Sequence, residues 1–183
     1  MRLARKGQGL TQRDLSRRCG VAQPNIAALE STEGKDANVA TVERLLAATG
    51  GRLTVIPSRA ITVAEVASQI AELLSANLST RAYRVWLALH DSLRSAEPAV
   101  RVALAVAPPA PTGDRNWDAL LAGLVDHDLA RLPTPSWVHE PGRVADGWFV
   151  DRAPGFETQI KRRTPAAFRR HGIWIDAAEL KSV

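Results

Sequence analysis

The sequence predicts a mainly α-helical protein with two domains. Apolar residues recur at helical spacing along most of the 183-residue chain, whereas the alternation typical of strands is confined to short stretches. Capping boxes, in which a residue that can cap a helix precedes an acidic residue by three positions, mark helix starts at Thr11, Thr62 and Asp176. With 45% hydrophobic residues, the chain can bury a sizeable core.

The segment 10–30 predicts two short helices joined by a tight turn at Gly20. Leu15 and Ile26 are spaced so that both can be buried on one side of the pair. Gly20 can adopt the left-handed conformation that the turn requires, and Pro24 falls in the first turn of the second helix. A helix pair of this kind can place its second helix in a DNA major groove.

Several residues of this segment form a specific motif, namely Leu10-Thr11-Gln12, Leu15-Ser16, Gly20-Val21, Gln23, Ile26 and Leu29-Glu30. Together they resemble the Cro/C1-type (XRE) helix-turn-helix family. The resemblance continues to about Pro57. It implies a lambda-repressor-like domain over residues 1–58 that binds double-stranded operator DNA and regulates transcription.

The remaining elements of this first domain follow from capping residues and periodicity. We expect helices over 2–7, 11–18, 23–31 and 38–49, the last capped by Asn38 and burying Val39, Val42, Leu45 and Leu46. A short strand should follow, formed by Leu53, Thr54, Val55 and Ile56.

A single strand cannot satisfy its backbone hydrogen bonds alone. Its partner is either the same strand of a second chain or a strand of the C-terminal domain. Some XRE-like regulators dimerise through such a strand, so the resemblance implies a homodimer.

Residues 59–183 predict a mostly helical α(+β) domain. Helices are expected over 62–78, from Thr80 to about 93, and over 115–132, with a short helix over 165–172 and a brief extended piece at 173–175. Residues 99–106 are apolar but too few to distinguish helix from strand, and 107–113 form a Pro-rich loop. Residues 133–155, rich in Pro and Gly, should form an ordered loop with buried aromatic side chains.

The resemblance assigns base contacts to the start of the second helix of the pair. Gln23 matches a position that commonly reads a base, and its amide can bond N6 and N7 of adenine. Asn25 offers similar chemistry. Ala22 stands where a small hydroxyl residue is often found, so this helix lacks a side-chain cap, and Ala28 permits close approach to DNA.

Phosphate contacts are expected from the basic residues of the same domain. Residues 1–59 hold ten Lys and Arg against five Asp and Glu, whereas residues 60–183 hold fourteen of each sign. The net charge of +5 is therefore confined to the first domain, as phosphate binding requires. The candidates are Arg13, Arg17 and Lys35, together with Gln12, which matches a family position that bonds a phosphate.

Arg5 and Glu30 have a different expected role. In the family, a basic residue of the first helix pairs with the acidic residue that ends the third, and these two residues occupy those positions. We interpret them as a structural ion pair rather than as DNA contacts.

Other function classes lack their sequence signals. There is no apolar run of about 18 residues, so we expect no membrane span. No apolar segment follows the basic start, so we expect no secretory signal. The expected location is the cytoplasm. No histidine lies in a metal-ligand pattern, and no nucleophile elbow, P-loop or dinucleotide fingerprint occurs. We therefore expect no metal, no cofactor and no enzymatic activity.

The second domain carries residues that suit a protein partner. Tryptophan and arginine are enriched at binding hot spots. The candidates lie in Pro/Gly-rich or terminal segments and in a basic cluster, and they are Trp137, Trp148, Trp174, Arg162, Arg163, Arg169 and Arg170.

The sequence thus favours an antitoxin that represses its own operon and neutralises a cognate toxin through its C-terminal domain. One alternative is a regulator whose C-terminal domain senses a small molecule. Another is a repressor fused to a toxin-like or RNA-modifying enzyme.

Overall fold

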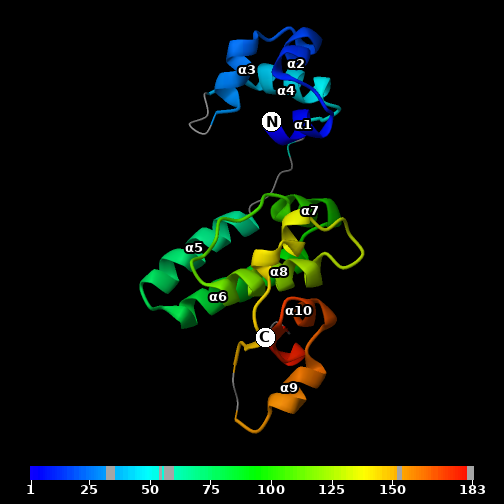
Figure 1. The fold of residues 1–183 in the computed structure, drawn as a ribbon. Helices are drawn as coiled ribbons and strands as arrows, with labels where there is room; N and C mark the ends of the chain where they lie inside the picture. Colours follow the sequence, from blue (N-terminus) through cyan, green and yellow to red (C-terminus); the bar gives the residue numbers. More distant parts are fainter. Residues whose placement is uncertain (32–35, 54, 56–59, 152–153, 181–183) are drawn as a thin grey trace. The chain divides into compact units, whose positions relative to one another are not determined.

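The computed structural model describes residues 1–31, 36–53, 55, 60–151 and 154–180. The chain divides into two compact units, Met1–Val55 and Ile56–Val183, close to the boundary expected after residue 58. The described residues form ten α-helices, three 3-10 helices and two very short strands, which confirms the mainly α fold class (Figure 1).

Unit 1 is a bundle of four short helices. They are α1 (Arg2–Gly7), α2 (Gln12–Cys19), α3 (Gln23–Leu29) and α4 (Val39–Ala48) (Figure 1). α2 packs against both α3 and α4. Their shared core consists of the buried side chains of Leu15, Val21, Ile26 and Leu45.

The predicted caps and turn of unit 1 are present. At the start of α2, the Thr11 hydroxyl accepts a hydrogen bond from Asp14 N at 3.1 Å, and Thr11 N donates to the Asp14 carboxylate at 3.0 Å. Gly20 ends α2 with φ +68°, a conformation that favours glycine. The Asn38 side chain caps α4 by accepting from Thr41 N at 2.8 Å.

The expected burial of Val39 is wrong, and the expected strand 53–56 is only partly described. Val39 was expected to be buried and is 62% exposed, because it is the first residue of α4 and the buried contact is supplied by Leu45 further along the helix. Of the expected strand, Thr54 and Ile56 lie outside the described residues. Leu53 and Val55 are exposed and belong to no described helix or strand, so the strand and its pairing remain a prediction.

Unit 2 is built around the buried helix α8 (Arg115–Asp128). A helical hairpin, α5 (Val63–Ser75) and α6 (Ser79–Ser95), packs on it together with α10 (Ala166–Arg170). α7 (Pro98–Ala105) packs on the hairpin, so the undecided segment 99–106 is helical through Ala105. The largest fully buried core side chains of this unit are Trp86, Phe168, Ile70, Leu89, Leu93, Leu120, Leu121, Leu124 and Leu129.

The expected loop 133–155 includes regular elements in its described residues, 133–151 and 154–155. It contains two 3-10 helices, η1 (Ser136–His139) and η2 (Pro141–Arg143), and the strand β1 (Trp148–Phe149). β1 pairs in parallel with β2 (Ile173–Trp174), with Trp148 opposite Ile173. Because parallel strands need a crossover connection, the chain between them forms α9 (Glu157–Arg163) and α10.

Several expected helix limits in unit 2 differ, and α5 ends at Ser75 rather than 78. α6 begins at Ser79 rather than being capped by Thr80, and its N-cap position, Leu78, has no side-chain cap. α8 ends at Asp128 rather than 132. The final turn is the 3-10 helix η3 (Ala177–Leu180), in which Asp176 accepts from Ala178 N at 2.9 Å, while the Glu179 carboxylate accepts from the Tyr83 hydroxyl at 2.7 Å.

Gly172 allows β2 to approach the segment before β1. Its φ is +67°, and a Cβ atom there would lie 2.0 Å from the carbonyl oxygen of Ala145. We expect Gly172→Ala to destabilise unit 2 by about 3–5 kcal/mol, since strain and backbone overlap add. All five tryptophans lie in unit 2, so tryptophan fluorescence during urea unfolding measures this unit alone.

Gly113→Ala is the matched control. Gly113 also has a positive φ, +88°, but a Cβ there would meet no atom within 4 Å. We expect a loss of about 1–2 kcal/mol from backbone strain only. Equal losses for the two variants would contradict the argument that the contact with Ala145 matters.

Candidate DNA interface

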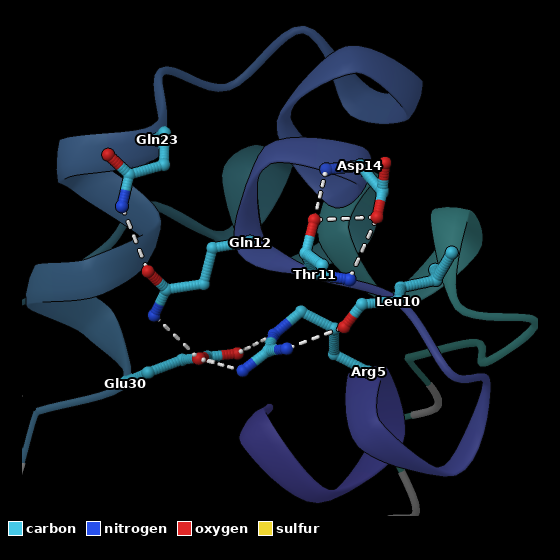
Figure 2. A network of polar contacts seen from close by, with 7 residues as sticks. All are labelled: Arg5, Leu10, Thr11, Gln12, Asp14, Gln23 and Glu30. Carbon is cyan, nitrogen blue, oxygen red and sulfur yellow. Dashed lines mark hydrogen bonds and ion pairs between the residues drawn. The ribbon is translucent and has the colours of Figure 1, made fainter.

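A buried ion pair joins the first and third helices of unit 1. The Arg5 guanidinium donates to both carboxylate oxygens of Glu30, at 2.9 Å and 2.7 Å, and the Arg5 and Glu30 side chains are only 9% and 2% exposed (Figure 2). The third donor group of Arg5 bonds the Leu10 carbonyl at 2.6 Å. This is the pair expected from the resemblance, and it fixes the end of α3 to α1.

The ion pair shifts the pKa of both partners. The hydrogen bonds from Arg5 lower the pKa of the Glu30 carboxyl, against the opposing effect of burial, with help from the Gln12 amide. The hydrogen bond to Glu30 raises the pKa of Arg5. Both groups are therefore charged in the folded protein at neutral pH.

Two glutamine amides extend this pair towards the start of α3. Gln12 Nε2 donates to the Glu30 carboxylate at 3.0 Å, and Gln23 Nε2 donates to Gln12 Oε1 at 2.9 Å (Figure 2). The result is a polar chain, Arg5–Glu30–Gln12–Gln23, that links α1, α2 and α3. We call it the polar chain below.

The polar chain orients the amide of Gln23. The bond to Gln12 uses one of the two amide hydrogens of Gln23. The amide still has a second N–H and a carbonyl oxygen, which is the pair of groups that an adenine edge requires. Gln12 is likewise committed to the protein through one N–H and its carbonyl, so a phosphate contact from Gln12 would use its second N–H.

The other predicted DNA contacts differ in exposure. Asn25, Arg13 and Arg17 are exposed, as is Ala22 at the N-cap of α3, which has no side-chain cap as expected. Ala28 is half-buried, and Lys35 lies outside the described residues. Arg17 forms an ion pair with Asp14 within α2. Hydrogen bonds from Thr11 and then from Arg17 lower the pKa of Asp14 to about 2.

The prediction that Trp137 of unit 2 contacts a partner is wrong. Trp137 is 2% exposed, and its indole N–H donates to the Ala105 carbonyl at 2.9 Å, so it belongs to the core. Trp148 and Trp174 are half-buried on the paired strands. The predicted basic residues, Arg162, Arg163, Arg169 and Arg170, are all exposed.

Two of these arginines have partners within unit 2. Arg163 pairs with Asp176 at 3.3 Å, and Arg170 pairs with Asp126 at 2.9 Å. Their charges are thus partly compensated by neighbouring carboxylates, which a partner protein would have to displace.

Two buried pairs of charged residues in unit 2 carry no local sequence signal. His90 Nδ1 lies 2.8 Å from Asp128, and Arg143 lies 3.3 Å from Asp118, with all four residues buried. Burial acts to lower the pKa of His90, but its hydrogen bond to Asp128, the negative charge of Asp128 and the hydrogen bond to the Leu180 carbonyl together outweigh burial, so the pKa is raised. These partners are more than twenty residues apart in sequence, where no local spacing rule applies.

Comparison with known proteins identifies unit 1. Residues 1–56 match a family model described as Helix-turn-helix. No curated protein and no solved structure matches the chain. This segment is a Cro/C1-type helix-turn-helix domain of the XRE family, and the match supports a DNA-binding transcriptional regulator. None of the described helices is both long and apolar enough to cross a membrane.

Removing Arg5 should strongly destabilise unit 1. Arg5→Met leaves Glu30 buried without its cation, which costs about 3–5 kcal/mol. Unit 1 has no tryptophan, so its unfolding appears as a far-UV circular dichroism transition without a change in tryptophan fluorescence. The double variant Arg5→Met, Glu30→Gln should recover part of the loss. A cost below about 1 kcal/mol for Arg5→Met would contradict a buried, essential pair.

The same pair gives unit 1 a dependence on pH. Because folding lowers the pKa of Glu30, its stabilising contribution is fully present above the pKa of the unfolded chain and is lost as the pH falls through the folded value. We expect Glu30→Gln to reduce the acid-induced fall in the free energy of unfolding of unit 1. Urea titrations at several pH values measure this. If the free energy of unfolding falls equally steeply below pH ~4.5 in the parent and Glu30→Gln proteins, the expectation is contradicted.

Proposed function

We propose that this protein is a sequence-specific repressor that reads operator DNA through the start of α3. The observation that carries the proposal is the polar chain, in which a buried ion pair and Gln12 orient the Gln23 amide on a helix-turn-helix domain. Orientation before binding reduces the entropy lost when a side chain contacts a base.

The proposed contacts fall into two classes. Gln23 and Asn25, at the start of α3, contact base edges in the major groove, and the small side chains of Ala22 and Ala28 permit close approach. The phosphate contacts are proposed for Gln12, Arg13, Arg17 and Lys35. Phosphate contacts set affinity for any sequence, whereas base contacts set preference.

The protein is further proposed to bind as a homodimer through the segment after α4. Leu53 and Val55 are 44% and 86% exposed, although both are apolar. Pairing of Leu53, Thr54, Val55 and Ile56 with the same segment of a second chain would cover them. Two domains would then meet half-sites about 34 Å apart, one turn of DNA.

The finer proposal is that the protein is an antitoxin. In this role unit 1 represses the operon, and unit 2 binds and neutralises a cognate toxin through the exposed Arg162 and Arg169 together with the half-buried Trp148. A toxin gene that overlaps the gene for this chain would support the role, and release of operator DNA would then depend on the toxin.

A second candidate is sensing of a small molecule by unit 2. Tyr83, Trp117 and Trp148 line a cavity of about 560 Å³ together with the carboxylates of Asp151 and Glu179. Aromatic faces beside carboxylates favour an organic cation. Operator DNA would then be released by that ligand, without any second protein.

Substitutions in unit 1 separate the two classes of contact. Gln23→Ala should lower affinity for the operator by about 1–3 kcal/mol while leaving affinity for random DNA nearly unchanged. Arg13→Ala should weaken binding to both DNAs similarly and reduce the salt dependence by about one phosphate contact. Fluorescence anisotropy at several salt concentrations measures both effects. Arg162→Ala in unit 2 is the matched control for loss of an exposed arginine.

If Gln23→Ala and Arg13→Ala both bind operator DNA like the parent protein, the assigned surface is wrong.

A charge within the proposed dimer segment should separate the two chains. Val55→Glu would place like charges near each other across the paired strands, so we expect a monomer in sedimentation velocity and a loss of affinity for the two-half-site operator. Val106→Glu, at an exposed valine of unit 2, serves as the control and should stay dimeric. A Val55→Glu protein that remains dimeric would rule out this segment as the interface.

A further inference from the structure

Three potential metal ligands converge in unit 2 from separate elements. Asp126 lies near the end of α8, His139 is the last residue of η1, and His171 directly follows α10. Each offers one ligand atom, and these atoms all lie within 4.8 Å of one another. Asp126 and His171 are buried, and His139 is exposed.

The hydrogen bond made by His171 decides which of its nitrogens is available. Nδ1 lies 2.8 Å from the Arg143 carbonyl oxygen. A carbonyl oxygen only accepts, so Nδ1 carries a hydrogen, and Nε2 is the nitrogen that can offer a lone pair to a metal. A histidine that binds a metal is commonly held in this way by a backbone carbonyl.

The available nitrogen is buried and has no hydrogen-bond partner among the described residues. Nε2 of His171 lies 3.3 Å from the Asp126 carboxylate, yet the two form no hydrogen bond. A nitrogen lone pair and a carboxylate oxygen repel each other at this distance unless a cation or a proton lies between them. A cation bound to both atoms would remove this repulsion.

We propose that Asp126, His139 and His171 bind a divalent transition-metal ion, with Zn²⁺ as the best match. Two ligands that are each about 2.0–2.1 Å from a tetrahedral Zn²⁺ lie about 3.3–3.4 Å from each other. The separation of His171 Nε2 and Asp126 Oδ2 is 3.3 Å. Imidazole nitrogens with one carboxylate suit Zn²⁺ better than Ca²⁺ or Mg²⁺, which prefer oxygen ligands.

The backbone around His171 supports the site. Ala145 N donates to the His171 carbonyl at 2.9 Å, so His171 is fixed to the segment 143–145 through both its ring and its backbone. The close approach at Gly172 holds the same segments together. The rings of His139 and His171 lie nearly parallel, 14° apart, with centroids separated by 6.2 Å.

Arg170 is the group that already balances the charge of Asp126. It donates two hydrogen bonds to the Asp126 carboxylate, at 3.0 Å and 2.9 Å, from a side chain that is 58% exposed. Because the side chain is exposed, it can move into solvent or remain as an outer partner of the carboxylate when a metal binds. Three protein ligands leave a fourth position for water or a ligand, as in open zinc sites.

Sequence spacing gave no signal of this site because its ligands come from three elements. Asp126, His127 and Asp128 are consecutive on α8 and point in different directions, as expected for a helix. Asp128 pairs with His90, and the His127 ring packs against Phe168, 5.6 Å between centroids. Of these three residues, Asp126 is the one that lies near His139 and His171.

The test uses the full chain after removal of metal by dialysis against a chelator. Titration with Zn²⁺ in a calorimeter should show one site per chain, and Co²⁺ should give the intense visible absorption of tetrahedral coordination. His139→Ala should weaken Zn²⁺ binding by at least about 100-fold, since even outer partners of metal ligands contribute 10–100-fold. His139 is exposed, so this variant should keep its fold, which far-UV circular dichroism verifies.

His127→Asn is the matched control, because His127 is a neighbouring histidine outside the ligand set. It should bind Zn²⁺ like the parent chain, and Zn²⁺ should raise the Tm of both proteins but not of the His139→Ala variant. Failure of the parent chain to bind either metal would overturn the proposal, as would equal Zn²⁺ affinity in the parent and His139→Ala proteins.

Discussion

The ion pair between Arg5 and Glu30 is the interaction on which the DNA-binding unit depends. It is buried, bidentate and placed where α1 meets the end of α3. Helices of six to eight residues have little intrinsic stability, so tertiary contacts must fix their positions. The small apolar core holds the helices together, and the ion pair sets the position of α3 relative to α1.

The polar chain shows how a structural pair can serve recognition without touching DNA. Glu30 accepts from Arg5 on one side and from Gln12 on the other, and Gln12 in turn accepts from Gln23. A displacement of the buried carboxylate would therefore move the amide that we assign to base reading. Stability and sequence preference are in this sense coupled through the same few atoms.

Capping residues and apolar periodicity predicted the helices and turns of this structure. They did not predict most contacts between segments that lie far apart in the sequence. The caps at Thr11, Asn38 and Thr62 and the turn at Gly20 depend on residues within four positions, and all are present. The Arg5–Glu30 pair was accessible only through the family resemblance. The burial of Trp137 and the convergence of His139 on Asp126 depend on how distant segments pack, which periodicity does not encode.

The parallel pairing of β1 with β2 has a consequence for the order in which the protein forms during synthesis. Ile173 and Ile175 are fully buried in the core of unit 2, although they lie close to the end of the described chain. The ribosome must therefore have synthesised the chain beyond Ile175 before unit 2 can fold completely. Unit 1 comprises Met1–Val55, which precede unit 2 in the sequence, and can fold before unit 2 is synthesised. A nascent chain would thus carry a folded unit 1 while the apolar segments of unit 2 are still exposed and need protection from aggregation.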